Sequence, residues 1–530
     1  MIKKLVLISS LVILINDLFA QSVTLPFEKI QRIEQERNLL LQDQQWHPIY
    51  PLTTNSLNQT IFPDIQQNSP SKERGFVNWL NRKLFHESLI NLDTAGLKLT
   101  IDPLVSFEIG RMIDEKQNTW VNTRGIKADG MIGKKVFFHT AFYESQAVFP
   151  KWTDIQANTL MVVPGQAMFK RFKETGFDYA FAEGHVTYSP SKYFDLKLGH
   201  GKNFIGDGYR SVFLSDAAFN YPYFIINTKV WNIEYVNIFS QLMDISQPKG
   251  SWDPWPKKYT TTHYLSWNIT KWLNIGLFES IVWDAGDSTG KRGFELQYLN
   301  PVIFYRPVEF SLGSPDNALL GGSIRFRILK SNFIYFQLLL DEFKLEHVLK
   351  GDGWWANKHG FQWGIKSFDP FGIKNLYIQA EYNHVRPYTY AHSTTLQNYG
   401  HYNQPLAHPQ GANFREVILI LEQRIKRWQM SYQLVRSTYG EDSTGTNFGH
   451  NIFFPYKTYV TEYGNKIGQG IKTKLFYHEL KLGYIVNPAT NLSLTAGLTI
   501  FNRKSDIAEI KDLHFWIGLR SAMFNRYYDF

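Results

Sequence analysis

Polar and aromatic side chains crowd into residues 386–416, where they could contact a bound molecule. The segment holds Tyr388, Tyr390, His392, Tyr399, His401, Tyr402, His408 and Asn413. Aromatic rings offer flat faces on which sugar rings can stack, and amide and imidazole groups can bond to sugar hydroxyls. The composition therefore suits carbohydrate, although an ordinary polar surface loop would look similar.

Two other segments combine charged residues with glycine and proline. Residues 199–211 hold four glycines and Arg210, and residues 299–317 hold Arg306, Asp316 and Asn317. The glycines do not form a phosphate loop, because no Gly-Lys-Ser/Thr follows at the required spacing. We keep two interpretations of residues 199–211, a tight loop at a strand end and a loop that faces a ligand. The nine candidate ligand contacts are Arg210, Arg306, Asp316, Asn317, Tyr388, His392, Tyr399, His401 and His408.

Catalytic and metal-binding patterns are missing from the sequence. The three histidines of residues 386–416 match no zinc spacing, and the chain has no cysteine to complete such a site. No Gly-x-Ser-x-Gly motif is present, and adjacent Asp341 and Glu342 would point to opposite faces of a strand. We therefore predict no metal, no cofactor and no enzyme. A barrel hydrolase that uses Ser211, Ser215 or Ser393 is the alternative.

From about residue 97 onward, apolar and polar residues alternate with a period of two. This alternation indicates the strands that would position the candidate residues. In residues 375–383, Leu376, Ile378, Ala380 and Tyr382 share one face, and polar residues fill most of the other. Similar alternation recurs in residues 428–434, 477–486 and 492–500. Each strand of a membrane barrel presents one side to lipid and the other to the lumen, so the recurrence predicts such a barrel.

The connections between these strands differ in length. Short turns at 330–332, 425–427 and 487–491 alternate with long polar segments such as 386–413 and 437–470. Short turns at one end and long loops at the other are typical of outer-membrane barrels. We predict an all-β, antiparallel transmembrane barrel of roughly 16 to 18 strands with a small N-terminal helical part. Charged residues should face its lumen, because they are costly against lipid.

The chain ends in an amphipathic segment that closes with an aromatic residue. Leu513, Phe515, Ile517 and Leu519 form one face, and the chain terminates at Phe530. A last strand with a C-terminal aromatic resembles the signal that barrel-assembly machinery reads. We therefore expect the final strand to run to the chain terminus, with His514, Trp516 and Arg520 on its lumen side.

The N-terminal residues indicate export and a separate helical region. Lys3 and Lys4 precede the apolar run 5–15, which is the pattern of a secretory signal peptide, assigned to 1–21. Residues 22–95 are polar, with helical spacing of apolar residues in 27–42 and 74–87, and residues 96–530 form the expected barrel. The helical region would lie in the periplasm, or beside or inside the barrel.

Composition agrees with an exported barrel. Aromatic residues make up 16% of the chain, which suits the aromatic girdles of a barrel at both membrane interfaces. The net charge of +9 fits either scattered solvated side chains or a surface that meets acidic polymers. Nucleic acid is not an expected partner of an exported barrel.

Several of these segments resemble the Wzi family of capsule-assembly outer-membrane proteins, and look closest to its RemB-like branch in gliding Bacteroidetes. The resemblance is carried by Leu-Gly-His-Gly-Lys at 198–202, Phe-Leu-Ser at 213–215, Tyr-Leu-Asn-Pro at 298–301, Ser-Pro-Asp-Asn-Ala-Leu-Leu-Gly at 314–321, Leu-Asp-Glu at 340–342 and Pro-Leu-Ala-His-Pro-Gln-Gly-Ala-Asn at 405–413. It implies an 18-stranded barrel in the cell outer membrane that binds or organises capsular or exopolysaccharide. For the RemB-like branch it implies a part in gliding motility or surface attachment.

The resulting hypothesis is a non-enzymatic barrel that binds surface polysaccharide. Its expected partners are surface polysaccharide or lipopolysaccharide, outer-membrane lipid and the barrel-assembly machinery. The alternative is a porin or channel for small solutes or sugars. An open lumen would favour the channel, whereas a lumen plugged by aromatic and arginine side chains would favour the polysaccharide-binding protein.

Overall fold

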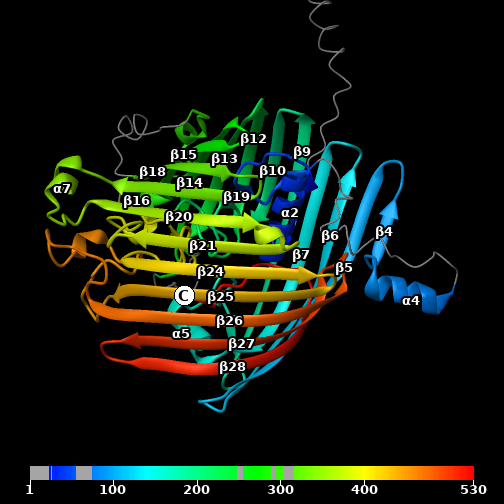
Figure 1. Ribbon diagram of the computed structural model, residues 1–530. Coiled ribbons are helices and arrows are strands. Elements are labelled where there is room, and N and C mark those ends of the chain that lie inside the picture. Colours follow the sequence, from blue (N-terminus) through cyan, green and yellow to red (C-terminus); the bar gives the residue numbers. More distant parts are fainter. Residues whose placement is uncertain are drawn as a thin grey trace, which may run out of the picture.

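The wall of the molecule is one closed, antiparallel β-barrel (Figure 1). The computed structural model describes residues 23–25, 27–54, 62, 75–246, 255–287, 290–291, 293–302 and 316–530. Eighteen long strands follow one another around the wall, and β28 closes it by pairing with β5. The prediction of an antiparallel barrel of about 18 strands is therefore confirmed.

The wall strands are β5 (Leu97–Met112), β6 (Asn118–Ile132), β7 (Val136–Val148), β9 (Gly176–Ser191), β10 (Phe194–Gly201), β12 (Tyr221–Val230), β13 (Ile233–Met243), β14 (Lys257–Thr270), β15 (Leu273–Asp284), β18 (Asn317–Ile328), β19 (Asn332–Glu342), β20 (Lys358–Phe368), β21 (Leu376–Val385), β24 (Phe414–Ile425), β25 (Trp428–Glu441), β26 (Ile471–Asn487), β27 (Leu492–Ser505) and β28 (Glu509–Arg520). Short strands β4 (Ile90–Asp93) and β8 (Lys170–Phe172) add to β5 and β9. Four small pairs lie outside the wall: β1 (Val23–Thr24) with β3 (Thr53–Thr54), β2 (Ile49–Tyr50) with β11 (Phe204–Ile205), β16 (Gly286–Asp287) with β17 (Gly290–Lys291), and β22 (Gly400–His401) with β23 (Gln404–Pro405).

Helices are few and short in the described part of the chain. The α-helices are α2 (Lys29–Leu41), α4 (Phe76–Phe85), α5 (Lys151–Leu160) and α7 (Leu345–Lys350). Single 3₁₀ turns are η1 (Leu296–Leu299), η2 (Pro370–Gly372), η3 (Thr395–Gln397) and η4 (Tyr456–Thr458). None of the described helices is both long and apolar enough to cross a membrane. Helices α2 and α4 fall within the two predicted helical segments, whereas the signal-peptide residues 1–21 lie outside the described residues.

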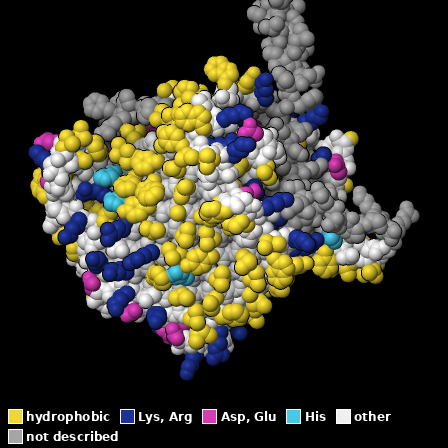
Figure 2. Space-filling model, viewed as in Figure 1, with side chains coloured by type: hydrophobic (Ala, Val, Ile, Leu, Met, Phe, Trp, Pro, Cys, Tyr) yellow, Lys and Arg dark blue, Asp and Glu magenta, His cyan; other side chains and the backbone are white. Residues whose placement is uncertain are grey.

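In the wall strands, alternate residues face the lumen and the outside, as the sequence pattern predicts. In β21, Tyr377, Gln379, Glu381 and Asn383 are buried toward the lumen, and the alternate residues are partly exposed on the outside. In β28, Phe515 and Ile517 are exposed while His514 is buried. Figure 2 shows hydrophobic side chains gathered across the outer face of the barrel. An apolar outer face on a closed barrel is what lipid requires, so this is an outer-membrane barrel.

The barrel has a short-turn end and a long-loop end. Short turns join β18 to β19, β24 to β25 and β26 to β27, as predicted. Long connections at the opposite end include residues 386–413 between β21 and β24, and residues 442–470 between β25 and β26. Outer-membrane barrels turn their short connections toward the periplasm and their long loops toward the outside. The short-turn end is therefore the periplasmic end.

Helix α2 lies inside the lumen at the short-turn end (Figure 1). Most of its residues have high helix propensity, but its buried residues are mainly polar. Charged side chains of the wall meet them: Lys366 Nζ lies 2.7 Å from Glu36 Oε2, and Arg424 Nη2 lies 3.2 Å from Glu34 Oε2. The helix is held by ion pairs because the lumen face of the wall is polar.

Other segments fill the rest of the lumen. Residues 202–220 leave the wall after β10, and β11 within them pairs with β2 of the N-terminal segment. Residues 386–413 fold inward and meet them, where the backbone N–H of Ser215 donates to the carbonyl of Leu406 at 2.8 Å. A large apolar cluster includes Phe204, Phe213 and Tyr390 from these segments. The lumen is therefore packed with chain.

The expectation that the final strand reaches the chain terminus is wrong. Strand β28 ends at Arg520, and residues 521–530 turn into the barrel as a C-terminal tail. The tail carries charged and hydroxyl groups that find partners inside. Arg526 pairs with Glu108, and the Tyr527 hydroxyl donates to Asp216 at 2.6 Å. If β28 continued in the wall, these polar groups would lie at the lipid boundary. Inside the barrel they find polar partners, which explains the inward turn.

We predict that Glu36→Gln destabilises the folded barrel. The substitution removes the nearer of the two carboxylates that pair with the buried Lys366 ammonium and leaves Asp207 Oδ1 at 3.4 Å. Breaking a buried ion pair costs about 3–5 kcal/mol, and the remaining carboxylate places this substitution at the lower end of that range. The measurement is thermal unfolding followed by circular dichroism in detergent. A Glu36→Met, Lys366→Met double variant removes both charges and should recover most of the loss; equal instability of the single and double variants would contradict the role of the ion pair.

Candidate functional site in the lumen and outer loops

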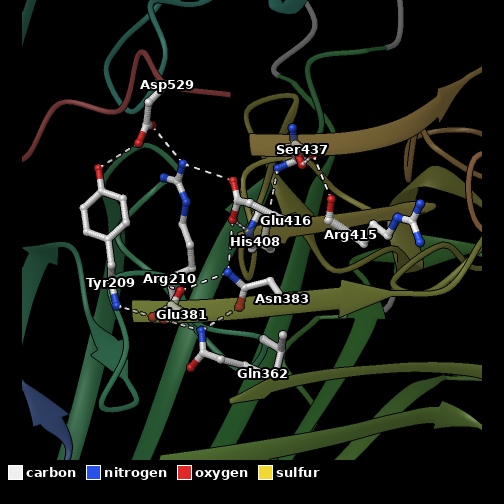
Figure 3. Close-up of polar contacts among 12 residues, drawn as sticks. Tyr209, Arg210, Gln362, Glu381, Asn383, His408, Arg415, Glu416, Ser437 and Asp529 are labelled. Atoms are coloured by element: carbon white, nitrogen blue, oxygen red, sulfur yellow. Dashed lines mark hydrogen bonds and ion pairs between the residues drawn. The ribbon is translucent and has the colours of Figure 1, made fainter. Parts of the chain in front are cut away.

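Arg210 lies at the centre of a buried polar network (Figure 3). Only 1% of its surface is exposed. Its Nη2 donates to Asp529 Oδ1 at 2.8 Å and lies 3.7 Å from Glu416 Oε1. The Tyr209 hydroxyl donates to the other oxygen of Asp529 at 3.0 Å. The guanidinium thus joins the C-terminal tail to strand β24 of the wall.

The network continues to residues 386–413, which we call the inward loop, and to strand β21. His408 Nε2 donates to Glu416 Oε2 at 2.7 Å, and the Gln410 backbone N–H donates to His408 Nδ1 at 3.2 Å. These two contacts require a neutral ring, and burial lowers the pKa of His408 accordingly. Glu381 of β21 accepts the backbone N–H groups of Tyr209 and Arg210 at 2.7 and 3.1 Å. Residues 202–220, the inward loop and the tail are thereby held together against the wall.

The aromatic and histidine residues predicted in 386–416 are buried in the inward loop. The Tyr388 hydroxyl donates to the carbonyl of Asn447 at 3.0 Å, and the Tyr390 hydroxyl donates to that of Val212 at 2.8 Å. Tyr399 stacks against Tyr390 with ring centroids 6.1 Å apart. This segment is therefore neither an ordinary surface loop nor an exposed binding face, because its side chains have partners within the protein.

His401 ties the inward loop to two neighbouring segments. The Met243 backbone N–H donates to its Nδ1 at 3.0 Å, and its Nε2 donates to the carbonyl of Asn220 at 3.1 Å. Because Nδ1 must accept, the ring can carry only one proton in this arrangement. Burial lowers the pKa of His401 to about 3, in agreement with that geometry.

The candidates from residues 299–317 meet the same loop. Asp316 accepts the Tyr298 hydroxyl at 2.7 Å, and Asn317 Nδ2 donates to the carbonyl of Gln397 at 2.8 Å. The side chain of Gln397 in turn meets His392 Nδ1 at 2.8 Å. Arg306 lies outside the described residues. The structure brings the eight described candidates into the interior, and their contact with a ligand stays a prediction.

An aromatic cluster at the long-loop end was missed by sequence reasoning. It consists of Trp354, Trp355, Tyr456, Tyr459 and Tyr463, all at least partly exposed. The Trp355 ring stacks on Tyr459 with centroids 4.6 Å apart and an interplanar angle of 13°, and it lies 5.1 Å from Tyr456. The adjacent tryptophans at 354–355 and the tyrosines within 456–463 were the available signal. Only the fold brings these two loops together.

Charged groups surround this outer aromatic cluster. Lys344 Nζ lies 4.8 Å from the centroid of the Trp354 ring, and Lys358 Nζ lies 4.7 Å from that of Tyr456. Arg386 Nη2 donates to the carbonyl of Trp354 at 3.3 Å. Cations placed over aromatic faces help to fix the rings. Carboxylates lie there too, since Lys358 pairs with Asp341 at 3.0 Å and Asp352 accepts the Trp354 backbone N–H at 3.0 Å. The cluster is thus a supported surface of rings with Lys344 and Arg386 as nearby cations.

A cavity with a mixed polar and apolar lining occupies the opposite, short-turn end of the lumen. It has a volume of about 430 Å³ and lies between residues 42–53 and the wall strands β9, β10, β12 and β13. Lys197 faces it, whereas Lys229 in the same lining pairs with Asp195 at 3.0 Å. The cavity lies away from the predicted candidates and from the outer aromatic cluster. Its lining combines polar side chains with apolar ones such as Ile225, Val236 and Ile238.

Comparison with solved structures finds a barrel of similar fold. Wzi of Escherichia coli, an outer membrane protein involved in group 1 capsule assembly and a carbohydrate-binding β-barrel, is similar with a TM-score of 0.54 at 15% identity, covering 95% of this chain and 100% of that chain. OprD of Pseudomonas aeruginosa has a TM-score of 0.41 at 12% identity, covering 82% of this chain and 98% of that chain. No known family profile and no curated protein sequence matches the chain. The Wzi-like fold is confirmed, and the RemB-like branch stays a prediction.

We predict that His401 makes the barrel less stable as the pH falls below 6.5. Its folded-state pKa of about 3 lies below the unfolded value of about 6.5, so only the unfolded chain takes up the proton between these values. The loss is about 2 kcal/mol at pH 5. The measurement is the melting temperature at pH 7 and pH 5. His401→Gln should show the smaller decrease, and the more exposed His200→Gln serves as control; equal decreases in all three proteins would contradict the role of His401.

Proposed function

We propose that this protein is a non-enzymatic outer-membrane barrel that binds surface polysaccharide at its long-loop end. The outer aromatic cluster is the observation that carries the proposal. Stacked and tilted rings at the surface offer the flat apolar faces that sugar rings pack against. The similarity of the fold to a carbohydrate-binding barrel adds support. Capsular polysaccharide, exopolysaccharide or lipopolysaccharide would be the ligand.

The positive charges beside the rings favour an acidic polysaccharide. Lys344 and Arg386 lie beside Trp354, where they could pair with carboxylate or phosphate groups of the glycan. The buried network below would act as a rigid floor, because Arg210 and Asp529 hold the filling segments together. In this proposal the predicted candidates of the inward loop position the surface loops that carry the outer aromatic cluster.

A role in gliding motility or surface attachment belongs to the same proposal. It rests on the resemblance to the RemB-like branch, and binding of surface polysaccharide is the activity that would serve it. Outer-membrane lipid and the barrel-assembly machinery are the further partners proposed. Comparison of spreading and of retained surface polysaccharide between a deletion strain and its parent tests this part.

We predict that Trp354→Ala and Tyr459→Ala each weaken binding to an acidic polysaccharide about 3- to 10-fold, which corresponds to the loss of one aromatic contact. The measurement is binding of the purified barrel to a panel of acidic and neutral glycans. Trp231→Ala is the matched control, since Trp231 is 94% exposed but lies in the short turn between β12 and β13. An equal effect of Trp231→Ala, or no binding to any acidic glycan, would overturn the proposal.

The alternative function is a porin or channel. A conductance measurement distinguishes a channel from a polysaccharide-binding barrel with a filled lumen. The segments that fill the lumen are held by buried ion pairs, so we predict that the protein is silent in a planar bilayer. Arg210→Ala removes the cation between Asp529 and Glu416, which then keep only hydrogen bonds such as those from Tyr209 and His408. It should produce intermittent openings, because the tail and the wall lose the charged group that they share. Steady conductance of the unaltered protein would favour the channel.

A further inference from the structure

Helix α4 lies outside the barrel at the short-turn end (Figure 1). Its last turn is tied to the rim, where Asn487 Nδ2 donates to the carbonyls of Lys83 and Glu87, both at 3.0 Å. Lys83 Nζ also lies 3.1 Å from Glu87 Oε2, and Arg82 Nε lies 3.3 Å from Glu87 Oε1. The end of the helix is therefore attached to the end of β26 through its backbone carbonyls, and the two ion pairs with Glu87 hold its last turn together.

The apolar side chains of α4 are exposed. Phe76 and Val77 have 74% and 77% of their surface exposed, and four other large apolar residues of this ten-residue helix are also exposed: Trp79, Leu80, Leu84 and Phe85. Positions 76, 80 and 84 follow one another at helical spacing and share a face. Exposed apolar patches of this kind mark contacts with protein or membrane. The helix thus presents an apolar face that the rest of the described chain leaves uncovered.

The wall next to α4 shows where the membrane boundary lies. Trp428 and Tyr484 pair across β25 and β26 on the outer face, with ring centroids 5.1 Å apart. Aromatic girdles of this kind mark the membrane interfaces of a barrel. Tyr484 lies only three residues before Asn487, which anchors α4. The helix is therefore attached at the level of the periplasmic girdle.

The apolar outer surface of the wall extends to the site where α4 is attached. Leu482 on β26 and Leu494 on β27 are exposed on the lipid side. Figure 2 shows hydrophobic side chains along the outer face of the barrel and again on the side of the molecule where α4 lies. Lipid that covers the girdle would reach the helix without interruption. A phospholipid layer is accordingly the occupant that the surroundings of α4 support.

We propose that α4 is an interfacial helix that lies flat in the periplasmic leaflet of the outer membrane. Its apolar residues enter the boundary between headgroups and acyl chains, as in other amphipathic interfacial helices. Arg82 and Lys83 lie close to the level of the lipid phosphates. The helix anchors the N-terminal region to the membrane beside the barrel, a role separate from polysaccharide binding at the opposite end.

The cysteine-free sequence allows a direct test. Leu80→Cys lies on the apolar face and Asn78→Cys on the opposite side of the helix, about 160° away at 100° per residue. Each is labelled with an environment-sensitive fluorophore and reconstituted in phospholipid vesicles. We expect blue-shifted emission at position 80, quenched at least twofold more strongly by brominated acyl chains than emission at position 78.

A second apolar position keeps the test decisive. Leu84→Cys should behave like Leu80→Cys, so a single variant that fails to fold does not remove the comparison. Water-like emission at both apolar positions would overturn the proposal. Blue-shifted emission without quenching by brominated lipid would overturn it as well, because protein rather than lipid would then cover the face.

Discussion

The guanidinium of Arg210 is buried between the carboxylates of Asp529 and Glu416, and the filling of the lumen depends on that contact. One carboxylate belongs to the C-terminal tail and the other to the wall. A buried charge is tolerated only with such partners, so the three groups hold each other in place. The arginine can be buried because the tail returns, and its contact with Asp529 adds to those that Arg526 and Tyr527 make inside the barrel.

The same principle explains the other segments in the lumen. Helix α2 buries Glu34 and Glu36 against Arg424 and Lys366 of the wall. The inward loop contributes His408 to Glu416 and fixes His401 between two backbone groups. The polar lumen face of the barrel therefore binds the segments of the same chain that fill the lumen. Loops set on this packed interior can present the outer aromatic cluster in a fixed arrangement.

The barrel could be predicted from the sequence because lipid and lumen impose opposite chemistry on alternate residues, as in β21. The course of the C-terminal tail could not, because Arg526 and Tyr527 find their partners, Glu108 and Asp216, in segments distant in sequence. The inward loop, residues 386–413, has the composition of a surface loop because the lumen that receives it is polar. Trp355 and Tyr459 meet only after two loops that follow different strands converge. The positions of single strands could be predicted from the sequence, whereas contacts between distant loops could not.

The central claim is that a barrel with a filled lumen binds polysaccharide at its outer loops. Hydrogen exchange of the protein in vesicles, with and without acidic polysaccharide from the cell surface, tests it most directly. We expect protection to increase in residues 343–357 and 442–470, and to stay unchanged in the short turns at 330–332, 425–427 and 487–491. Protection confined to the short-turn end, or no change anywhere, would contradict it.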